Sequence, residues 1–245
     1  MSAIAVVLAA GSGNRLGLPT PKAFVTVGGR SILAMAAHAA AACPDIAGLV
    51  VTVPGGWEDR ARAELPGSMP CEVVVGGASR HQSVGLALGA VPPDVAAVLC
   101  HDAARCLASP ELFSSVLAAL EEADGAVPVV PVPDTVKRLR DGLVVGTEPR
   151  SELGLAQTPQ AFRASALRDA HRRAAPEGLE FTDDAAALEW AGYTVRAVPG
   201  EPQNFKITTR EDLARADELA RAGSPARRVP VAPASPPTPS LGTRG

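Results

Sequence analysis

The sequence predicts an α/β fold built on a doubly wound, mostly parallel sheet, and two observations support this fold class. The first is a set of five apolar, β-branched runs with the near-continuous hydrophobicity of strands that are covered on both faces. These runs occupy residues 3–8, 48–53, 71–76, 95–100 and 125–130. The second is the helical periodicity of the segments between them, at 31–43, 57–65, 79–91 and 109–123. Strands and helices that alternate in this way form parallel sheets through crossover connections.

Two of the predicted helices begin with recognisable signals. Ser109 precedes Pro110 and Glu111, a favourable order of N-cap, first helical residue and first-turn acid. Ser79 stands where a cap is needed for the helix over 79–91. We therefore expect both serines to cap their helices.

The alternation of strands and helices stops after residue 131. Two short strand-like pieces flank Asp141-Gly142, a dipeptide typical of hairpin turns. The segment has too few apolar residues for a core of its own, so we expect a projecting β-arm at about 133–158. Because such an arm usually needs a partner surface, we also expect a homodimer formed through it.

The C-terminal part returns to regular structure and then loses it. We expect a helix from Thr182 as N-cap to Gly192 as C-cap, a strand at 193–200 and a last helix that begins near Thr208 or Thr209. The remainder, 223–245, is rich in Pro, Ser and Ala without periodicity, which is typical of disorder. The sequence thus predicts one domain over 1–222 and a disordered tail.

The composition argues against several classes of function. A net charge of −3 and an aromatic content of 3% provide neither a basic surface nor stacking platforms for nucleic acid. The four cysteines form no C-x-x-C pair, which disfavours a zinc knuckle and suits a reducing compartment. No apolar stretch approaches the roughly 20 residues of a membrane span, so we expect a cytoplasmic protein without membrane contacts.

The loop AAGSGNRLG follows the first predicted strand. Gly11 and Gly13 fit the G-x-G-x-x-G dinucleotide pattern, but Leu16 occupies the third glycine position. The second strand ends without the acidic residue that a dinucleotide site uses, and no G-K-[ST] follows as in a Walker A loop. The glycine pattern alone therefore favours neither site.

The same loop can still hold a polyphosphate. Its backbone amides from Ala9 to Gly13 can donate to phosphate oxygens, and Arg15 and Lys22 follow closely with positive charge. The alternative is a surface turn with two solvated cations.

Three further clusters carry polar chemistry. In GGASRHQSV, a glycine loop opens a helix, and Gly76, Arg80 and Ser83 could contact a base or ribose. Asp102 lies just past the end of a buried strand, where open α/β sheets bind ligands, and its oxygens suit Mg²⁺. The alternative for Asp102 is a salt bridge to Arg105, and we expect neighbouring His101 to be structural.

The third of these clusters is NFKITTREDL. Its Lys206 shortly precedes a predicted helix start, where the helix dipole disfavours a cation. A nearby anion would relieve this repulsion. We therefore expect Lys206 to be a functional residue.

Taken together, the motifs resemble one enzyme family. LAAGSGNRLG…PKAF, GGASRHQSV, HDAAR, PVPDTVK, R-x7-TPQ-x-F, TDDAAALE and NFKITTREDL follow the order and spacing of 2-C-methyl-D-erythritol 4-phosphate cytidylyltransferases over about 3–221. The resemblance implies a nucleotide-diphospho-sugar-transferase-like (Rossmann-like) fold with a dimerising arm. It also implies that CTP and methylerythritol phosphate react, with Mg²⁺, to give the CDP-alcohol and pyrophosphate in isoprenoid precursor synthesis.

The resemblance also assigns roles to residues of this chain. Arg15 and Lys22 would stabilise the α-phosphate in the transition state, and Arg150 and Lys206 would hold the attacking phosphate. Arg150 would do so in the neighbouring subunit's site. The nucleotide would be bound by Ala9, Ala10, Gly11, Gly13, Gly76, Arg80, Ser83, Asp102 and Ala103. The polyol phosphate would be bound by Asp102, Arg105, Thr135, Arg150, Thr158, Thr182 and Lys206, with Asp102 also facing the metal.

Four positions depart from the family pattern. Ala23 stands where Gln is common, Cys106 replaces a usual Pro, Asp184 shortens a common Glu, and Ala78 replaces a frequently polar residue. None of these departures removes a cation proposed to act on the reacting phosphates. Three alternatives stay open: a ribitol 5-phosphate cytidylyltransferase, a nucleotide-binding module without turnover, and a dinucleotide-dependent dehydrogenase.

Overall fold

The structure is a computed structural model that describes residues 2–11, 13 and 16–223. Arg15 and residues 224–245 of the predicted tail lie outside the described residues. Among those that are described, no helix is long and apolar enough to span a bilayer.

An eight-stranded sheet forms the centre of the molecule, in the order β10-β7-β11-β6-β1-β4-β5, with β12 paired to β7. All five predicted strands are present, and the α/β fold class is confirmed. The pairs β1–β4, β1–β6, β4–β5 and β7–β12 are parallel. The strands are β1 (Ala3–Leu8), β4 (Ile46–Val53), β5 (Cys71–Val75), β6 (Ala97–Asp102), β7 (Gly125–Pro131), β10 (Gly154–Ala156), β11 (Gln160–Arg163) and β12 (Val195–Pro199).

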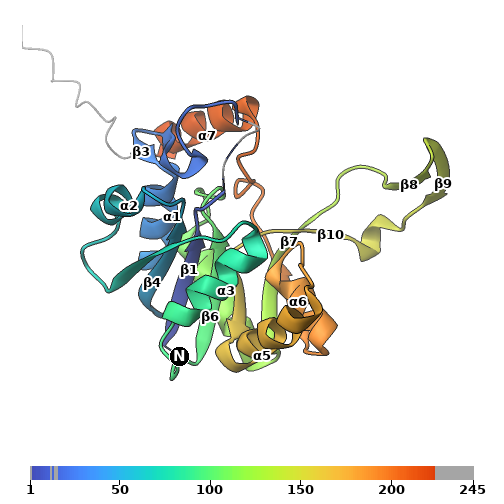
Figure 1. Cartoon of the computed structure of the whole chain (residues 1–245). Helices are drawn as coiled ribbons and strands as arrows, with labels where there is room; N and C mark the ends of the chain where they lie inside the picture. Colours follow the sequence, from blue (N-terminus) through green and yellow to red (C-terminus); the bar gives the residue numbers. More distant parts are fainter. Residues whose placement is uncertain (1, 12, 14–15, 224–245) are drawn as a thin grey trace, which may run out of the picture.

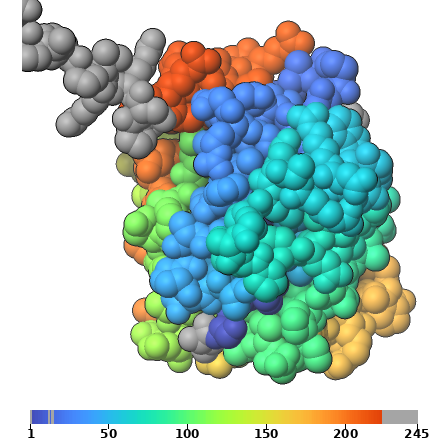
Figure 2. Space-filling model, turned by 90° about the vertical axis from the view of Figure 1, so that its left-hand side faces the viewer, coloured from blue at the N-terminus to red at the C-terminus, as the bar shows by residue number. Residues whose placement is uncertain are grey.

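Helices cover both faces of this sheet (Figure 1). One core cluster packs α1 (Ile32–Ala41), α2 (Glu58–Glu64), α4 (Pro110–Ala118) and α7 (Arg210–Gly223). The other packs α3 (Arg80–Ala90), α5 (Ala164–Ala174) and α6 (Asp184–Ala191). Figure 2 shows the side of the molecule on which α1, α2 and α7 lie. The N-terminal segments, in blue and cyan, cover most of this surface, with α7 above them.

The helix starts follow from their caps, with one correction. Ser79 and Ser109 cap α3 and α4 as predicted, each accepting a hydrogen bond from the backbone N–H three residues on. The predicted cap Thr182 is wrong: Asp183 caps α6, and its Oδ1 accepts from the Ala186 N–H at 3.0 Å. Thr and Asp both serve as N-cap residues, and here the cap is Asp183, which directly precedes the first turn of α6. Gly192 ends α6 with φ +87°, as predicted.

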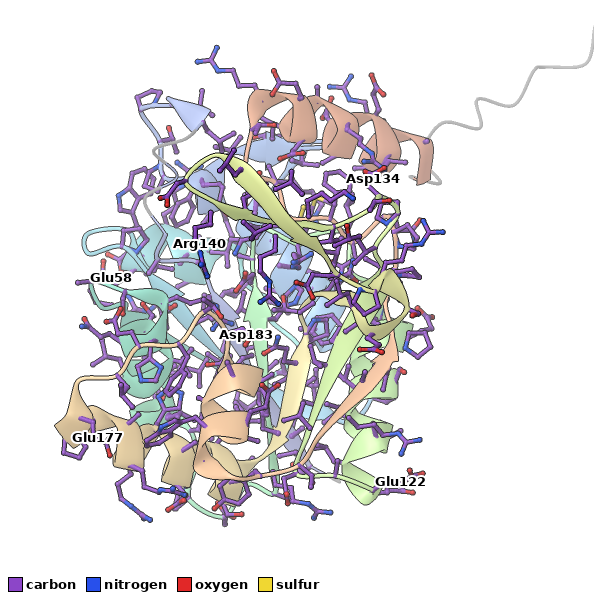
Figure 3. All side chains as sticks on the ribbon, turned by 90° about the vertical axis from the view of Figure 1, so that its right-hand side faces the viewer. Glu58, Glu122, Asp134, Arg140, Glu177 and Asp183 are labelled. Atoms are coloured by element: carbon purple, nitrogen blue, oxygen red, sulfur yellow. The ribbon has the colours of Figure 1, made fainter. Side chains whose placement is uncertain are left out.

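The predicted arm is a hairpin of β8 (Lys137–Arg140) and β9 (Leu143–Thr147). Asp141 and Gly142 both have positive φ, at 49° and 78°, which is the geometry of a tight hairpin turn. The hairpin extends far from the sheet (Figure 1), and Figure 3 shows it from its own side, with Arg140 labelled. The predicted boundary of 158 is too late, because β10 already pairs with β7 in the central sheet.

Smaller elements connect the larger ones. β2 (Thr26–Val27) and β3 (Arg30–Ser31) form a two-stranded sheet beside α7. Single 3₁₀ turns occur at η2 (Lys22–Phe24), η3 (Ala119–Glu121), η4 (Arg150–Glu152) and η5 (Ala175–Glu177). The predicted start of the tail at 223 is one residue early, since α7 extends through Gly223.

Candidate active site

A cavity of about 450 Å³ opens at the carboxyl ends of β1 and β6. In Figure 1 these strands run from the N-terminus at the bottom up toward α7, so the cavity lies at the upper edge of the sheet. This is the edge at which open α/β sheets bind ligands. The wall combines the loop after β1, the start of α3, the end of β6 and the segment before α7.

Most of the predicted nucleotide-binding and catalytic residues meet in this wall. Those that line it are Ala9, Ala10, Gly11, Gly13, Lys22, Arg80, Ser83, Asp102, Ala103 and Lys206. Further lining residues were not predicted, namely Leu8, Ala23, Ile32, Thr52, Gly77, Ala78, Ser79, Ala104 and Thr208. Thr52 carried a usable signal, because it is a polar residue inside an otherwise apolar strand.

The glycines of the loops are required by close packing. A Cβ placed on Gly13 would lie 2.6 Å from Cβ of Lys22, and the φ of Gly13 is +67°. A Cβ on Gly76 would lie 2.2 Å from Cβ of Ala10. Gly76 does not line the cavity itself but allows the two predicted loops to touch. The glycine pattern thus brings Lys22 and the two loops together.

Asp102 at the end of β6 holds two cations. Its Oδ2 accepts from Nζ of Lys206 at 2.6 Å, and its Oδ1 accepts from Nε of Arg80 at 3.0 Å. Burial alone would raise the pKa of Asp102, but the charges and hydrogen bonds of Arg80 and Lys206 outweigh it and hold that pKa well below its usual range. Asp102 is therefore ionised throughout the physiological pH range.

Arg80 at the start of α3 lies between two carboxylates. Besides the contact to Asp102, its Nη1 lies 2.8 Å from Oδ2 of Asp184. Burial lowers the pKa of Arg80, while Asp184 and then Asp102 raise it by more, so the guanidinium stays charged. Arg80 was predicted to contact a base or ribose, and its ion pairs with two acids were not foreseen.

The two lysines of the wall come from opposite ends of the chain. Lys22 donates from Nζ to the Ile207 carbonyl at 3.1 Å, so it reaches the segment that carries Lys206. Lys206 lies four residues before the start of α7 at Arg210. The anion expected near Lys206 is supplied within the chain by Asp102.

A buried polar network supports Asp102 and the Lys206 segment. The Thr158 hydroxyl accepts from the Asp102 N–H at 2.9 Å and contacts Nδ1 of His101 at 3.2 Å. Asn204, which is fully buried, donates to the Thr158 carbonyl at 2.9 Å and to Oε1 of Gln157 at 3.2 Å. Thr158 was predicted to bind the polyol phosphate, which stays a prediction; in the structure its buried side chain holds the backbone of Asp102. Gln157 and Asn204 were not predicted, although each lies in a quoted motif.

His101 is structural in this arrangement, as expected. It is fully buried against Phe113, with ring centroids 4.9 Å apart. Burial lowers its pKa to about 4, so the ring is neutral at physiological pH.

Six of the predicted residues that the structure describes do not line the cavity: Gly76 and Thr158, described above, and Arg105, Thr135, Thr182 and Arg150. Arg105 does not pair with Asp102; it donates to the carbonyls of Asn204 at 2.9 Å and Ala156 at 3.0 Å. Thr135 and Thr182 are exposed. Arg150 is also exposed and donates to the Pro133 carbonyl at 3.1 Å within the base of the arm.

Among the departures from the family pattern, Ala23 and Ala78 lie in the cavity wall. Cys106 is buried, and burial raises the pKa of its thiol to about 12. A protonated, inaccessible thiol is unreactive, so this cysteine adds no chemistry to the site.

The fit of a divalent cation depends on Asp102, the one acid in the described lining. Within the described part of the chain, no three His, Cys, Asp or Glu side chains form a group that could hold a metal. Magnesium in nucleotide enzymes is commonly held by one or two carboxylates together with substrate phosphates. Asp102 fits that mode, with most ligands supplied by a polyphosphate.

Comparison with known proteins agrees with this arrangement. Residues 3–222 match the family described as IspD: 2-C-methyl-D-erythritol 4-phosphate cytidylyltransferase. The bifunctional enzyme IspD/IspF of Nitratidesulfovibrio vulgaris is 44% identical over 223 residues, which cover 86% of this chain and 56% of that protein. The chain therefore spans little more than half the length of such curated relatives.

Solved structures of shorter relatives match along nearly their whole length. The 2-C-methyl-D-erythritol 4-phosphate cytidylyltransferase of Thermus thermophilus is 39% identical with a TM-score of 0.75, covering 90% of this chain and 100% of that one. The 4-diphosphocytidyl-2C-methyl-D-erythritol synthase of Anaerococcus prevotii is 29% identical with a TM-score of 0.80, covering 89% and 97%. The fold, the cavity and these matches agree, and the chain belongs to the 2-C-methyl-D-erythritol 4-phosphate cytidylyltransferase family.

Proposed function

We propose that this protein transfers the cytidylyl group of CTP to 2-C-methyl-D-erythritol 4-phosphate. A phosphate oxygen of the polyol attacks the α-phosphorus, the bond to the bridging oxygen of pyrophosphate breaks, and pyrophosphate leaves. The observation that carries the proposal is the meeting of Lys22 and Lys206 around one glycine-lined cavity in a chain of this family. Because the attacking phosphate is already deprotonated, the protein needs no nucleophile and acts by positioning and charge stabilisation.

Lys22 is the residue proposed to act on the transition state. Its position beside the loop after β1 suits contact with the α-phosphate, where negative charge builds up during transfer. Arg15 keeps the same role as a prediction from the sequence.

Lys206 is proposed to hold the attacking phosphate. It is paired with Asp102, and an incoming phosphate would share or take over its ammonium group. The strongly acidic Asp102 would remain ionised meanwhile. The polar contacts that fix Asp102, through Thr158 and Arg80, would then set where the polyol phosphate binds.

Mg²⁺ belongs to this proposal because enzymes of the family generally use a divalent cation. Asp102 would hold it together with the triphosphate, and the bound ion would supply charge neutralisation at the phosphates. The chain's own cations, Lys22 and Lys206, act beside it on the reacting groups.

The arm is proposed to complete the site of a second copy. It exposes Leu139, Leu143 and Val144 at 64, 70 and 63% of their surfaces, more apolar surface than an isolated hairpin would keep in water. Arg150 at its base is exposed and donates to the Pro133 backbone carbonyl. We propose a homodimer in which Arg150 of one subunit binds the phosphate in the other's site.

Mixing two inactive variants tests this shared site. If Arg150 acts across the dimer, a heterodimer of Arg150→Ala and Lys22→Ala subunits has one intact site. An equimolar mixture should then regain about a quarter of the wild-type rate, since half of the dimers are mixed and each has one working site. No regain in a mixture whose heterodimers are confirmed by native mass spectrometry would overturn the shared site.

The reaction itself is tested with purified protein, CTP and Mg²⁺. Pyrophosphate release should follow addition of methylerythritol phosphate and not of ribitol 5-phosphate. Release with ribitol 5-phosphate alone would favour the sister activity, and CTP binding without turnover on either would favour a non-catalytic module. An NADH titration with fluorescence readout tests the dehydrogenase alternative.

The single domain over 1–222 and the cytoplasmic location stay predictions. Cell fractionation tests the location.

A further inference from the structure

Asp184 is a buried carboxylate to which the proposed reaction assigns no role. It is the first residue of α6, directly after Asp183, which Figure 3 labels, and its side chain is 1% exposed. It lies outside the cavity wall, but its Oδ2 is 2.8 Å from Nη1 of Arg80, which lines the cavity. A buried charge is costly unless it is paired, so Asp184 and Arg80 depend on each other.

The pairing links three elements in one line of charges. Asp184 at the start of α6 contacts Arg80 at the start of α3, Arg80 contacts Asp102 at the end of β6, and Asp102 contacts Lys206. Charges alternate along this line, and two carboxylates balance two cations. Every contact between neighbours is 3.0 Å or shorter.

The planar guanidinium makes this link directional. Arg80 donates from Nε to Asp102, and its Nη1 forms an ion pair with Asp184, so two carboxylates hold the guanidinium at two different nitrogens. With Asp184 neutral, Asp102 would be the remaining carboxylate partner of Arg80. Arg80 would then draw Asp102 more strongly, in competition with Lys206.

We infer that Asp184 is a positioning residue for the proposed transfer: by holding Arg80 it leaves Oδ2 of Asp102 to Lys206 and so fixes the site of the polyol phosphate. This inference rests on the proposed function for its kinetic consequence. His171 also lies near this carboxylate, with its Nε2 at 3.7 Å from Oδ1 of Asp184.

The kinetic test separates the two substrates. Asp184→Asn keeps the shape of the side chain and removes its charge. We expect the KM for methylerythritol phosphate to rise about tenfold, which is the size of effect expected from the loss of one charge-assisted hydrogen bond. The KM for CTP should change less than about twofold, because the loop after β1 and Lys22 are untouched. Asp184→Glu restores the carboxylate and should return the polyol phosphate KM to within about threefold of wild type.

A matched control separates positioning from a general loss of stability. Asp124 also pairs with an arginine, at 3.8 Å from Arg163, but it precedes β7 at the opposite end of the sheet from the cavity. Asp124→Asn should leave both KM values unchanged. Should Asp184→Asn not fold, Asp184→Ser also removes the charge and should show the same difference between substrates.

A second readout does not depend on activity. The ¹⁵N signal of Arg80 Nε should shift in Asp184→Asn and not in Asp124→Asn. Equal KM values for wild type and Asp184→Asn, no rescue by Asp184→Glu, or an unchanged Arg80 signal would each overturn the inference. A wild-type protein that releases no pyrophosphate would instead overturn the proposed function. The Arg80 signal would still test the contact between Asp184 and Arg80.

Discussion

The cavity and the arm place their polar and apolar groups in opposite ways. In the cavity, Lys22, Arg80 and Lys206 all have partners in their own chain, and a buried network holds those partners. In the arm, large apolar side chains extend into solvent, and the hairpin contacts mainly itself. One chain thus organises the charges of the cavity by itself, whereas the proposed role of the arm depends on a second molecule.

The largest effect is expected in the cavity. Lys22→Ala should lower kcat by about 10²–10³-fold, because its charge is needed most where negative charge builds up in the transition state. The Kd for CTP, measured by calorimetry, should rise less than about fivefold. An unchanged kcat would contradict the role assigned to Lys22.

The arm should respond through association. Leu143→Asp places a charge in the exposed apolar surface of β9, which should shift the protein to monomers and lower activity about tenfold at dilute concentration. Light scattering and activity measured over the same concentration series check this. A wild-type protein that is monomeric and fully active would refute the proposed association through the arm.

A smaller effect concerns pH and the buried network. His101 has a pKa of about 4 when folded and about 6.5 when unfolded, so between these values the unfolded chain binds more protons. Stability should therefore fall as pH decreases from 7 to 5, with His101 contributing about 1–2 kcal/mol of that fall.

His101→Asn removes this titration while keeping a polar group near Thr158. Urea unfolding of both proteins at the two pH values should show a shallower pH dependence for the variant. If the stability of both proteins depended on pH to the same extent, the His101 imidazole would take up its proton without unfolding the protein.

The smallest effect is expected on the surface of the arm. Arg138 pairs with Glu148 at 2.7 Å, but its side chain is 68% exposed. Arg138→Ala should change the free energy of unfolding by about 0.5 kcal/mol or less, as is usual for exposed ion pairs. A loss well above about 1 kcal/mol would indicate that this pair is buried against a partner.

The sequence predicted the parts of the fold that are encoded locally. The five core strands and the capped helices α3 and α4 carry continuous hydrophobicity or N-cap signals in their own residues. β11 was not predicted, because its four residues form a strand only by pairing with β6 and β7. Its antiparallel direction likewise depends on partners distant in the sequence.

The residues of the site also fall into those that the sequence could predict and those that depend on contacts between distant elements. The glycine loops, Asp102 and Lys206 could be found because they lie next to the ends of predicted elements, and Lys22 because it follows the first glycine loop closely. The link from Arg80 to Asp184 could not, since it needs α3 and α6 to lie on the same face of the sheet. The same holds for Thr158, whose hydroxyl faces Asp102 only after β11 has paired with β6.

The contacts of α7 have a consequence for heat inactivation. Asp217 on this helix accepts from the Gly28 N–H at 2.8 Å, and Arg210 donates to the Leu16 carbonyl at 3.2 Å. A helix on the outside of a fold opens locally before the central sheet melts. Fraying of α7 would release the loop after β1, so catalysis should disappear on warming while the far-ultraviolet signal of the sheet is still intact.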